Sequence, residues 1–176
     1  RNFFTMARPS KSDYIPFYET YVSLVPENDI KEALLQSLPL VESFLDSIPG
    51  NKADFAYADG KWTIKQLIQH AIDAERIFCY RALCIARGES QNLPGFEENE
   101  YARQAVVDHR TLRELRDEFL AVRKASILLF NSFTQEMMDA KGRSNNNPIS
   151  ALSIGYILVG HWKHHQRILT ERYLKG

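Results

Sequence analysis

Three of the five histidines of this 176-residue chain lie within five positions near its C-terminal end, at His161, His164 and His165. His161 and His165 are four residues apart, which on a helix places their imidazoles on one face, one turn from each other. Two imidazoles at this spacing can bind the same metal ion, as they do in helical zinc sites. The first chemistry that the sequence suggests is therefore metal ligation.

The direction in which this helix face points separates two interpretations. Positions at helical spacing from the pair are apolar, so both histidines are expected to point into the protein. A single inward histidine is most simply a core residue with hydrogen-bonded ring nitrogens, whereas two in register are harder to satisfy separately, so the pair alone leaves both interpretations open. His164, about 100° around the helix, is expected at the partly exposed edge. The inward stripe comprises Ala151, Ile154, Leu158, His161, His165, Leu169 and Arg172.

A third inward histidine lies on a different predicted helix. His70 falls beside Leu67, Ala74 and Ile77 on the apolar face of a segment that begins near Thr63. Three neutral imidazoles with an open fourth position are typical of a catalytic zinc site, whereas structural sites are closed by four ligands, usually with cysteines. The sequence therefore predicts that His70, His161 and His165 bind one divalent ion, Zn²⁺ or a similar borderline metal.

Four long amphipathic segments must position these histidines. Capping boxes at Thr63 with Gln66 and at Thr111 with Glu114 begin two of them, and Ser150 can cap the last. No segment has the alternation of a strand, and no repeat is present, so an all-α fold, a four-helix bundle, is predicted, with the metal site between facing helices. The predicted helices cover residues 28–48, 63–87, 111–133 and 150–174.

The connections also carry expectations. Residues 89–108 are predicted to be a long irregular segment that either is functional or covers another part of the protein, because loops of this length are uncommon in compact domains. Residues 142–148 are expected to form a turn. An N-terminal arm is expected to pack its aromatic residues on the bundle. These aromatic residues are Tyr14, Phe17, Tyr18 and Tyr21.

The composition excludes several classes of protein. Lys and Arg together number 22 and so do Asp and Glu, with no dense basic run, which argues against a nucleic-acid surface. No apolar run is long enough to span a membrane, and residues 1–6 lack the pattern of a secretory signal. Cys79 and Cys84 would lie about 140° apart on one helix and are expected to be reduced thiols in a cytoplasmic protein.

The chain is expected to form one domain over residues 7–176. Residues 1–6 are then an N-terminal extension, with Met6 the candidate natural start and the preceding residues added by cloning or by an uncertain gene boundary.

Specific motifs follow one another along the chain. They are Trp62-Thr63, then HAIDAER at residues 70–76, LPGFE at 93–97 and GHWKHH at 160–165. Their residues, order and separation resemble those of the DinB-like, or YfiT-like, superfamily over nearly the whole chain. The resemblance implies a bundle with up-down-down-up order, commonly a homodimer, and a Zn²⁺ or Ni²⁺ ion held by one histidine of the second helix and an H-x-x-x-H pair of the fourth. Carried over by position, these ligands are His70, His161 and His165.

The function that the resemblance implies is broader. Relatives include S-transferases that use low-molecular-weight thiols, a thiol-dependent isomerase and proteins described as metal-dependent hydrolases, and many have no known activity. The favoured hypothesis is a metal-dependent transferase that joins a small thiol to an electrophilic substrate. A metal-dependent hydrolase and a non-catalytic, stress-associated binding or scaffold protein are the alternatives.

No general base can be assigned from the sequence. Asp73 and Glu75 are expected to be surface charges or to support the histidines. Arg76, Arg81 and Arg167 are expected to form ordinary surface or interhelix pairs unless they line the cavity at the site. Self-association as a homodimer is expected from the resemblance and from apolar residues that flank the inner stripe of the last helix. These flanking residues are Tyr156, Ile157 and Trp162.

Overall fold

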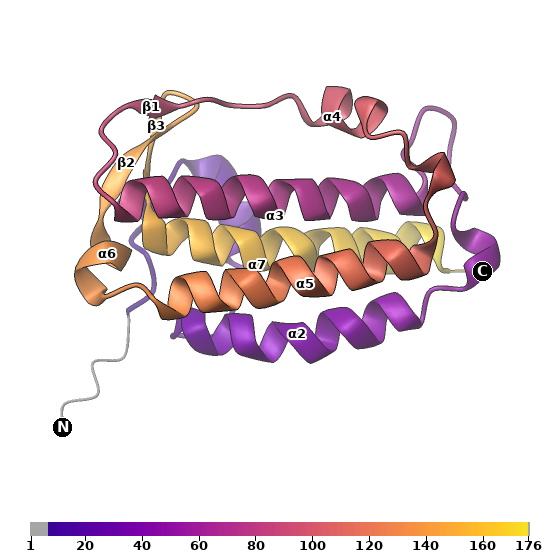
Figure 1. Ribbon diagram of the computed structural model, residues 1–176, viewed down its shortest axis with the longest axis horizontal. Helices are drawn as coiled ribbons and strands as arrows, with labels where there is room; N and C mark the ends of the chain where they lie inside the picture. The colour runs from indigo at the N-terminus through magenta and orange to yellow at the C-terminus, as the bar shows by residue number, and fades with distance from the viewer. Residues whose placement is uncertain (1–6, 176) are drawn as a thin grey trace.

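The computed structural model describes residues 7–175, so the predicted extension at residues 1–6, including Met6, lies outside the described residues. The described chain is an all-α, four-helix bundle with a small sheet at one end (Figure 1). The four predicted helices are confirmed to within a few residues at each end. Their bounds are Ile30–Asp46 (α2), Ile64–Ala86 (α3), Leu112–Asn131 (α5) and Ala151–Ile168 (α7), with a π-helical turn at Leu169–Tyr173 after α7.

The bundle has the up-down-down-up order. α2 and α7 run one way and α3 and α5 the other, so that α3 and α5 are parallel neighbours (Figure 1). α7 packs on α3 and α2, and α5 packs on α2 and α3. Because α3 and α5 point in the same direction, the chain must return along the whole length of the bundle between them. The long connection at 89–108 makes this return.

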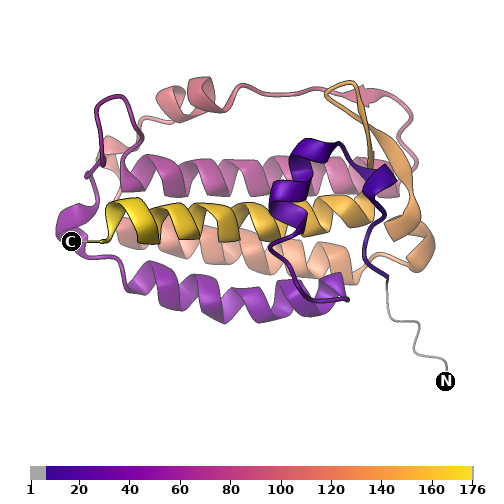
Figure 2. The ribbon, with the colours of Figure 1, turned by 180° about the vertical axis from the view of Figure 1, so that it is seen from behind.

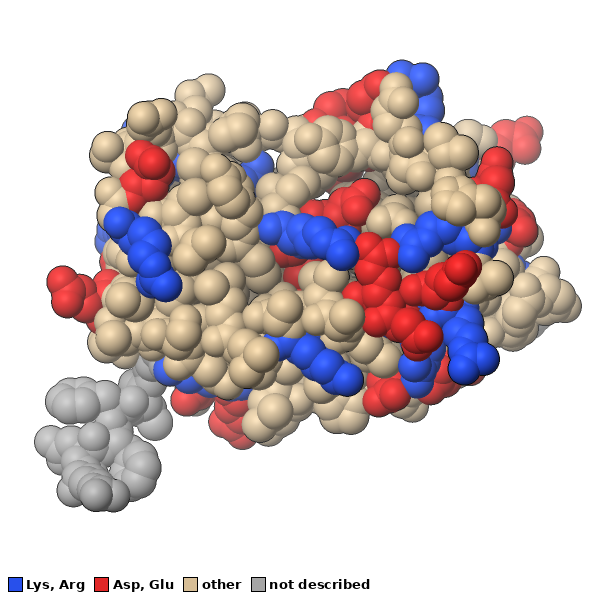
Figure 3. All heavy atoms as spheres, viewed as in Figure 1, with Lys and Arg blue, Asp and Glu red and all other residues tan. Residues whose placement is uncertain are grey.

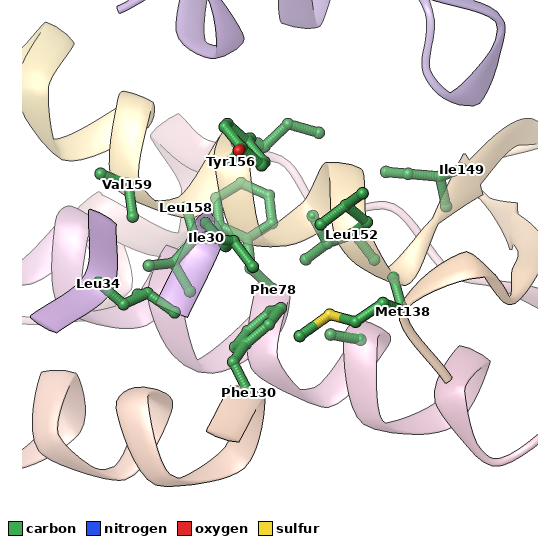
Figure 4. Packing of buried hydrophobic residues seen from close by; sticks show 14 of the residues in the cluster. Ile30, Leu34, Phe78, Phe130, Met138, Ile149, Leu152, Tyr156, Leu158 and Val159 are labelled. Carbon is green, nitrogen blue, oxygen red and sulfur yellow. The ribbon is translucent and has the colours of Figure 1, made fainter. Parts of the chain in front are cut away.

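The helices begin where the sequence places their caps. Thr63 and Gln66 form one capping box, and Thr111 and Glu114 form another. Ser150 caps α7. Inside the bundle, side chains of α2, α3, α5, α6 and α7 interdigitate in the first of two apolar clusters (Figure 4). Residues labelled there include Ile30, Leu34, Phe78, Phe130, Met138, Leu152 and Leu158.

The connections contain more regular structure than predicted. The expectation that no strand is present is wrong, because residues 142–148 belong to a hairpin, and the irregular segment at 89–108 contains a strand and two short helices. The strands escape sequence patterns since they are two to four residues long. The elements are Gly50–Lys52 (η3), Asn92–Leu93 (β1), Glu98–Gln104 (α4), Val107–His109 (η4), Gln135–Asp139 (α6), Lys141–Ser144 (β2) and Asn147–Ser150 (β3).

The hairpin fixes the start of the crossover. β2 and β3 are antiparallel and joined by Asn145 and Asn146, both at positive φ, as a two-residue hairpin turn requires. β1 pairs in parallel with β2. The Asn145 backbone N–H donates to the Leu93 carbonyl at 2.8 Å, and that of Asn146 to the Asn92 side chain at 2.7 Å. The crossover therefore leaves this sheet in a defined direction toward the site described below.

The aromatic arm packs on α7, as predicted (Figure 2). Arg8 anchors it, donating to the Val22, Val25 and Glu27 carbonyls and lying 5.0 Å from the centre of the Tyr156 ring. The arm contains Lys11–Asp13 (η1), Pro16–Tyr18 (η2) and Glu19–Val22 (α1).

The arm changes the expected role of the outer face of α7. Tyr156, Ile157 and Trp162, which were expected to support a dimer, are 0%, 0% and 3% exposed and are buried within one chain. A helix that is apolar all round is covered on every side. Two-fold self-association stays a prediction, but these three residues do not contribute to an exposed interface.

The surface agrees with the balanced charge of the sequence. On the face formed by α3 and α5, acidic and basic side chains intermingle (Figure 3), and Arg116 pairs with Glu42, Asp46 and Asp117 there. Cys79 and Cys84 are free thiols, as predicted. Within residues 7–175, no helix combines the length and apolarity needed to cross a membrane.

Candidate metal centre

The three predicted histidines meet between two antiparallel helices. His70 comes from α3, and His161 and His165 from successive turns of α7. The Nε2 atom of His161 lies 3.1 Å from that of His70 and 3.0 Å from that of His165, and ligand atoms of all three residues lie within 4.8 Å of one another. The structure thus brings together all three residues selected from the sequence.

These imidazoles are held neutral by their surroundings. Their side chains lie in the bundle, with residue exposures of 3%, 6% and 9% for His70, His161 and His165. Burial lowers the pKa of His70 to about 4 and is the main cause that lowers the pKa of His165 to about 3. Burial and then the neighbouring His165 and His70 hold the pKa of His161 well below its ordinary value. Neutral imidazole is the form that ligates a metal.

The arrangement fits a metal better than hydrogen bonding alone. A neutral ring nitrogen carries either one hydrogen or one lone pair, so His161 Nε2 cannot donate to one neighbour and accept from the other. Nitrogen ligands at about 2.0–2.1 Å from a zinc ion lie about 2.9–3.4 Å apart, which matches the two short separations. One divalent ion would satisfy all three lone pairs.

Small and aromatic residues position the ligands. Gly160, next to His161, lets the Tyr21 backbone lie directly on α7: a Cβ there would lie 2.0 Å from the Tyr21 carbonyl oxygen. The Tyr21 ring consequently stands 5.3 Å from the His161 ring, edge to face. Trp62, just before α3, lies 4.8 Å from His70, and Phe78 lies 5.6 Å from His161. These contacts restrict the rotation of the imidazoles.

The histidines are reached from two cavities. The larger, with a volume of about 360 Å³, is bordered by His70 and His161 and is hereafter called the main cavity. The smaller, of about 230 Å³, is bordered by His165 and Trp62. Asn99 of α4 borders both. Besides the histidines, the main cavity is lined by Phe17, Tyr18, Tyr21, Ala74, Phe78, Arg81, Gly95, Phe96, Glu97, Glu98, Asn99 and Asn145.

A carboxylate that sequence reasoning missed approaches the site from the crossover. Glu98 Oε2 lies 3.9 Å from His70 Nε2. Burial, followed by the charge of Glu97, raises the pKa of Glu98 above its ordinary range. Glu98 sits at the first position of α4, a short helix in a segment expected to be irregular, so no local pattern connected it with His70. Its place is set by the return of the chain over α3.

The other charged residues singled out in the sequence have different places. Glu75 is 3% exposed and forms an ion pair with Arg123 of α5, so the expectation of a surface or histidine-supporting role is wrong. Asp73 is half-buried and accepts from Gln69 at 2.9 Å. Arg76 pairs with Glu118, as an ordinary interhelix residue does.

Two further expectations concern Arg81 and His164. Arg81 is 4% exposed and borders the main cavity, so it is the exception among the three arginines and not an ordinary surface or interhelix residue. The signal was its spacing, eleven residues from His70, which returns to the same helix face. His164 is half-buried at the edge of the stripe, as predicted.

The chain is similar to known proteins in both sequence and fold. A family model described as the DinB superfamily matches residues 33–169. A Geobacillus thermodenitrificans (strain NG80-2) protein named "Putative metal-dependent hydrolase" is 28% identical over 158 residues, which cover 84% of this chain and 86% of that protein. The structure of YfiT from Bacillus subtilis, described as a probable metal-dependent hydrolase with an unusual four-helix bundle topology, matches 93% of this chain and 90% of its own with a TM-score of 0.66. At 14% identity, the latter likeness shows the fold.

Proposed function

Because the chain belongs to the DinB superfamily, we propose that it is a metal-dependent enzyme in which His70, His161 and His165 hold one divalent ion. The observation that carries this proposal is the convergence of three buried, neutral imidazoles that border two neighbouring cavities. Zn²⁺ and Ni²⁺ both suit imidazole ligands. When bound, such an ion lowers the pKa of a thiol or water in its open position and so supplies a nucleophile at neutral pH.

The proposed reaction is transfer of a low-molecular-weight thiol to an electrophilic small molecule. A thiolate is a soft ligand and a better nucleophile toward alkyl electrophiles than hydroxide. A volume of about 360 Å³ is within the range of small-molecule sites. Phe17, Tyr18 and Tyr21 of the arm and Phe96 of the crossover contribute aromatic surface to this cavity, against which the apolar part of a small molecule can pack.

Hydrolysis is the second candidate, and one observation favours it. The Glu98 carboxylate lies 3.9 Å from His70 Nε2, and its raised pKa brings it closer to the neutral range in which a general base works best. A water between Glu98 and the ligands would lose its proton to this carboxylate. Thiol transfer has less need of such a base, because small thiols ionise more readily than water. The names of the relatives support metal-dependent chemistry in general.

Elemental analysis of the purified chain and then a turnover screen test the proposal. One equivalent of Zn²⁺ or Ni²⁺ per chain is expected, together with conjugation of a panel of small thiols to an electrophile such as a haloalkane. His109→Ala is the matched control for His161→Ala, because His109 is exposed and outside the site. Metal-dependent ester or amide hydrolysis that Glu98→Gln removes would favour the hydrolase. Stoichiometric metal without turnover of either kind would favour the non-catalytic binding protein.

A further inference from the structure

One face of α3 forms the floor of the main cavity. His70, Ala74, Phe78 and Arg81 follow one another at spacings of four, four and three residues, and all four line this cavity. The floor thus begins with a candidate metal ligand, continues over small and apolar side chains, and ends with a cation. A molecule lying along it would contact groups of different chemistry at its two ends.

Arg81 is buried without an acidic partner. The residue is 4% exposed, yet no carboxylate of residues 7–175 lies within 4.0 Å of its guanidinium nitrogens. One Nη2 hydrogen is donated to the Pro94 carbonyl at 2.8 Å, and the guanidinium carbon lies 5.8 Å from the centre of the Phe96 ring. The Tyr18 hydroxyl, which lines the same cavity, is a further hydrogen-bond partner of Arg81. These neutral partners fix the orientation of the group but leave its charge without an anion. Buried charges are normally paired.

The other fully buried arginine of the described chain shows what such pairing looks like. Arg123 donates to both oxygens of Glu75 at 2.8 Å and to the Ser37 hydroxyl at 2.6 Å. It borders none of the cavities at the histidines. Arg81 is similarly buried and lies at a cavity, but within residues 7–175 no carboxylate pairs with it.

We propose that the ligand supplies this carboxylate: the main cavity binds a small molecule whose carboxylate group pairs with Arg81 while its other end reaches the histidines. The planar guanidinium matches a carboxylate with two parallel hydrogen bonds. One guanidinium balances one negative charge, so a singly charged carboxylate suits the site better than a doubly charged phosphate. The assignment of the reacting end rests on the proposed function, whereas the carboxylate site rests on Arg81 alone.

The helix geometry limits the length of this molecule. Eleven residues correspond to about 16 Å along the α3 axis, and the long Arg81 side chain tilts toward the helix N-terminus and therefore toward His70. The carboxylate and the group at the histidines are therefore roughly 8–12 Å apart. This separation suits an extended, peptide-sized acid.

The two acidic residues that line the cavity, Glu97 and Glu98, do not pair with Arg81 in place of a ligand carboxylate. Glu97 accepts from the Asn99 backbone N–H at 3.0 Å as the cap of α4. Glu98 lies at the opposite end of the floor, 3.9 Å from the His70 ring nitrogen. The cavity is therefore positive at Arg81 and acidic beside the histidines, which orients a carboxylate toward Arg81.

Calorimetric titration of the metal-free, full-length chain with octanoate and with octanamide tests the carboxylate site. Octanoate is expected to bind the wild type roughly tenfold or more tighter than octanamide. Arg81→Met is expected to abolish this preference. Arg81→Lys is expected to keep part of it, because lysine retains the positive charge but lacks the two parallel N–H donors of the guanidinium. Arg76→Met is the matched control on the same helix, since Arg76 is half-exposed and lies outside the main cavity. It should retain the wild-type preference.

The melting temperature separates binding from a structural role. Arg81→Met is expected to unfold at or near the wild-type temperature, because the variant removes a buried charge that has no acidic partner. Equal affinity of octanoate for the wild type and Arg81→Met would overturn the proposal. So would a loss of melting temperature as large as that of Arg123→Met, or no binding of octanoate to the wild type.

A second titration tests the metal half separately. With one equivalent of Co²⁺ bound, 8-mercaptooctanoate is expected to give thiolate-to-metal absorption at lower concentration than 8-mercaptooctanol. Absence of Co²⁺ binding or of this absorption would contradict the proposed function and leave the octanoate result to decide the role of Arg81. Thiolate absorption at equal concentrations for the two compounds would support the metal chemistry and contradict the Arg81 site.

Discussion

Two buried polar clusters lie in the same bundle, and they differ in whether their members satisfy one another. In the closed cluster, Glu75 accepts from Nε and Nη2 of the Arg123 guanidinium and from the Ser126 hydroxyl at 2.7 Å. In the open cluster, formed by the three histidines and by Arg81, the ring nitrogens face one another, and no carboxylate of residues 7–175 pairs with the guanidinium. His70, His161 and Arg81 line the main cavity, and His165 borders the smaller one. Both clusters are almost completely buried. Burial alone therefore does not distinguish a structural from a functional polar group.

This difference indicates which buried groups bind a ligand. A buried charge whose partner is in the protein needs nothing else, and the closed cluster serves to join α2, α3 and α5. A buried group whose partner is missing lowers stability unless something else binds it, and such groups persist at functional sites. The open cluster offers three imidazole ligands for a cation at one end and guanidinium donors for an anion at the other. The following predictions separate the two clusters by experiment.

The largest effect is expected for metal binding when the open cluster is broken. Changing His161 and His165 to Ala leaves one imidazole, so the affinity for Zn²⁺ should fall by several orders of magnitude. The bundle should remain folded, because its apolar core is unchanged and the ring-nitrogen lone pairs of three imidazoles no longer face one another. Elemental analysis and circular dichroism measure the two outcomes. Bound metal at wild-type stoichiometry in the double variant would contradict the assignment of ligands.

The next largest effect is expected for stability when the closed cluster is broken. Arg123→Met leaves the Glu75 carboxylate buried without a cation and should lower the free energy of unfolding by about 3–5 kcal/mol. Denaturation by guanidinium chloride measures this loss. The double variant with Glu75→Leu removes both charges and should recover most of the loss, while metal binding stays at wild-type stoichiometry in every variant that folds. Equal stability of the single and double variants would show that Glu75 does not need Arg123.

The fold was largely predictable from the sequence because it rests on local signals. Apolar periodicity and the capping boxes at Thr63 and Thr111 define the helices without knowledge of their partners. The His161–His165 pair is likewise a local pattern. His70 could be joined to it because an inward-facing histidine is unusual and because of the family resemblance.

The rest of the site depends on contacts between distant segments. Arg81 and Glu75 have the sequence appearance of exposed residues, and their burial follows from the crossover and from α5 respectively. Tyr156 is buried because the arm covers the outer face of α7. The all-apolar run around Ile157 did contain this signal, since a helix apolar on every side must be covered. The strands were too short to show a period.

The open cluster should also make the metal-free protein sensitive to acid. The pKa of His70 is about 4 in the folded chain, against 6.5 as its ordinary value, because burial disfavours the charged form. Between these values the unfolded chain binds a proton that the folded chain does not, so stability falls as the pH falls from 6.5 toward 4. This residue alone accounts for roughly 3 kcal/mol over that window.

Urea unfolding of the metal-free chain at several pH values between 7 and 4 measures this effect. The glutamine in His70→Gln cannot take up this proton. Between pH 6.5 and 4 the free energy of unfolding of this variant should therefore fall by roughly 3 kcal/mol less than that of the wild type. His109→Gln, an exposed histidine outside the site, should behave as the wild type does. Parallel pH profiles for the wild type and His70→Gln would contradict the depressed pKa.

The smallest effect is expected where the arm meets the open cluster. In Gly160→Ala the new methyl group would lie 2.0 Å from the Tyr21 carbonyl oxygen, a backbone atom that cannot turn aside, so the arm must move away from α7. A loss of about 1–3 kcal/mol is expected, as for other overpacked contacts. Hydrogen exchange should accelerate in α1, whereas metal stoichiometry should persist because α3 and α7 still bring the three imidazoles together.

Gly155→Ala is the matched control on the same helix, since its methyl group meets Ile30 and Phe130 of the core. Gly155→Ala should lower the stability without faster hydrogen exchange confined to α1. If hydrogen exchange in α1 is unchanged in Gly160→Ala, the wall of the main cavity does not depend on this close approach.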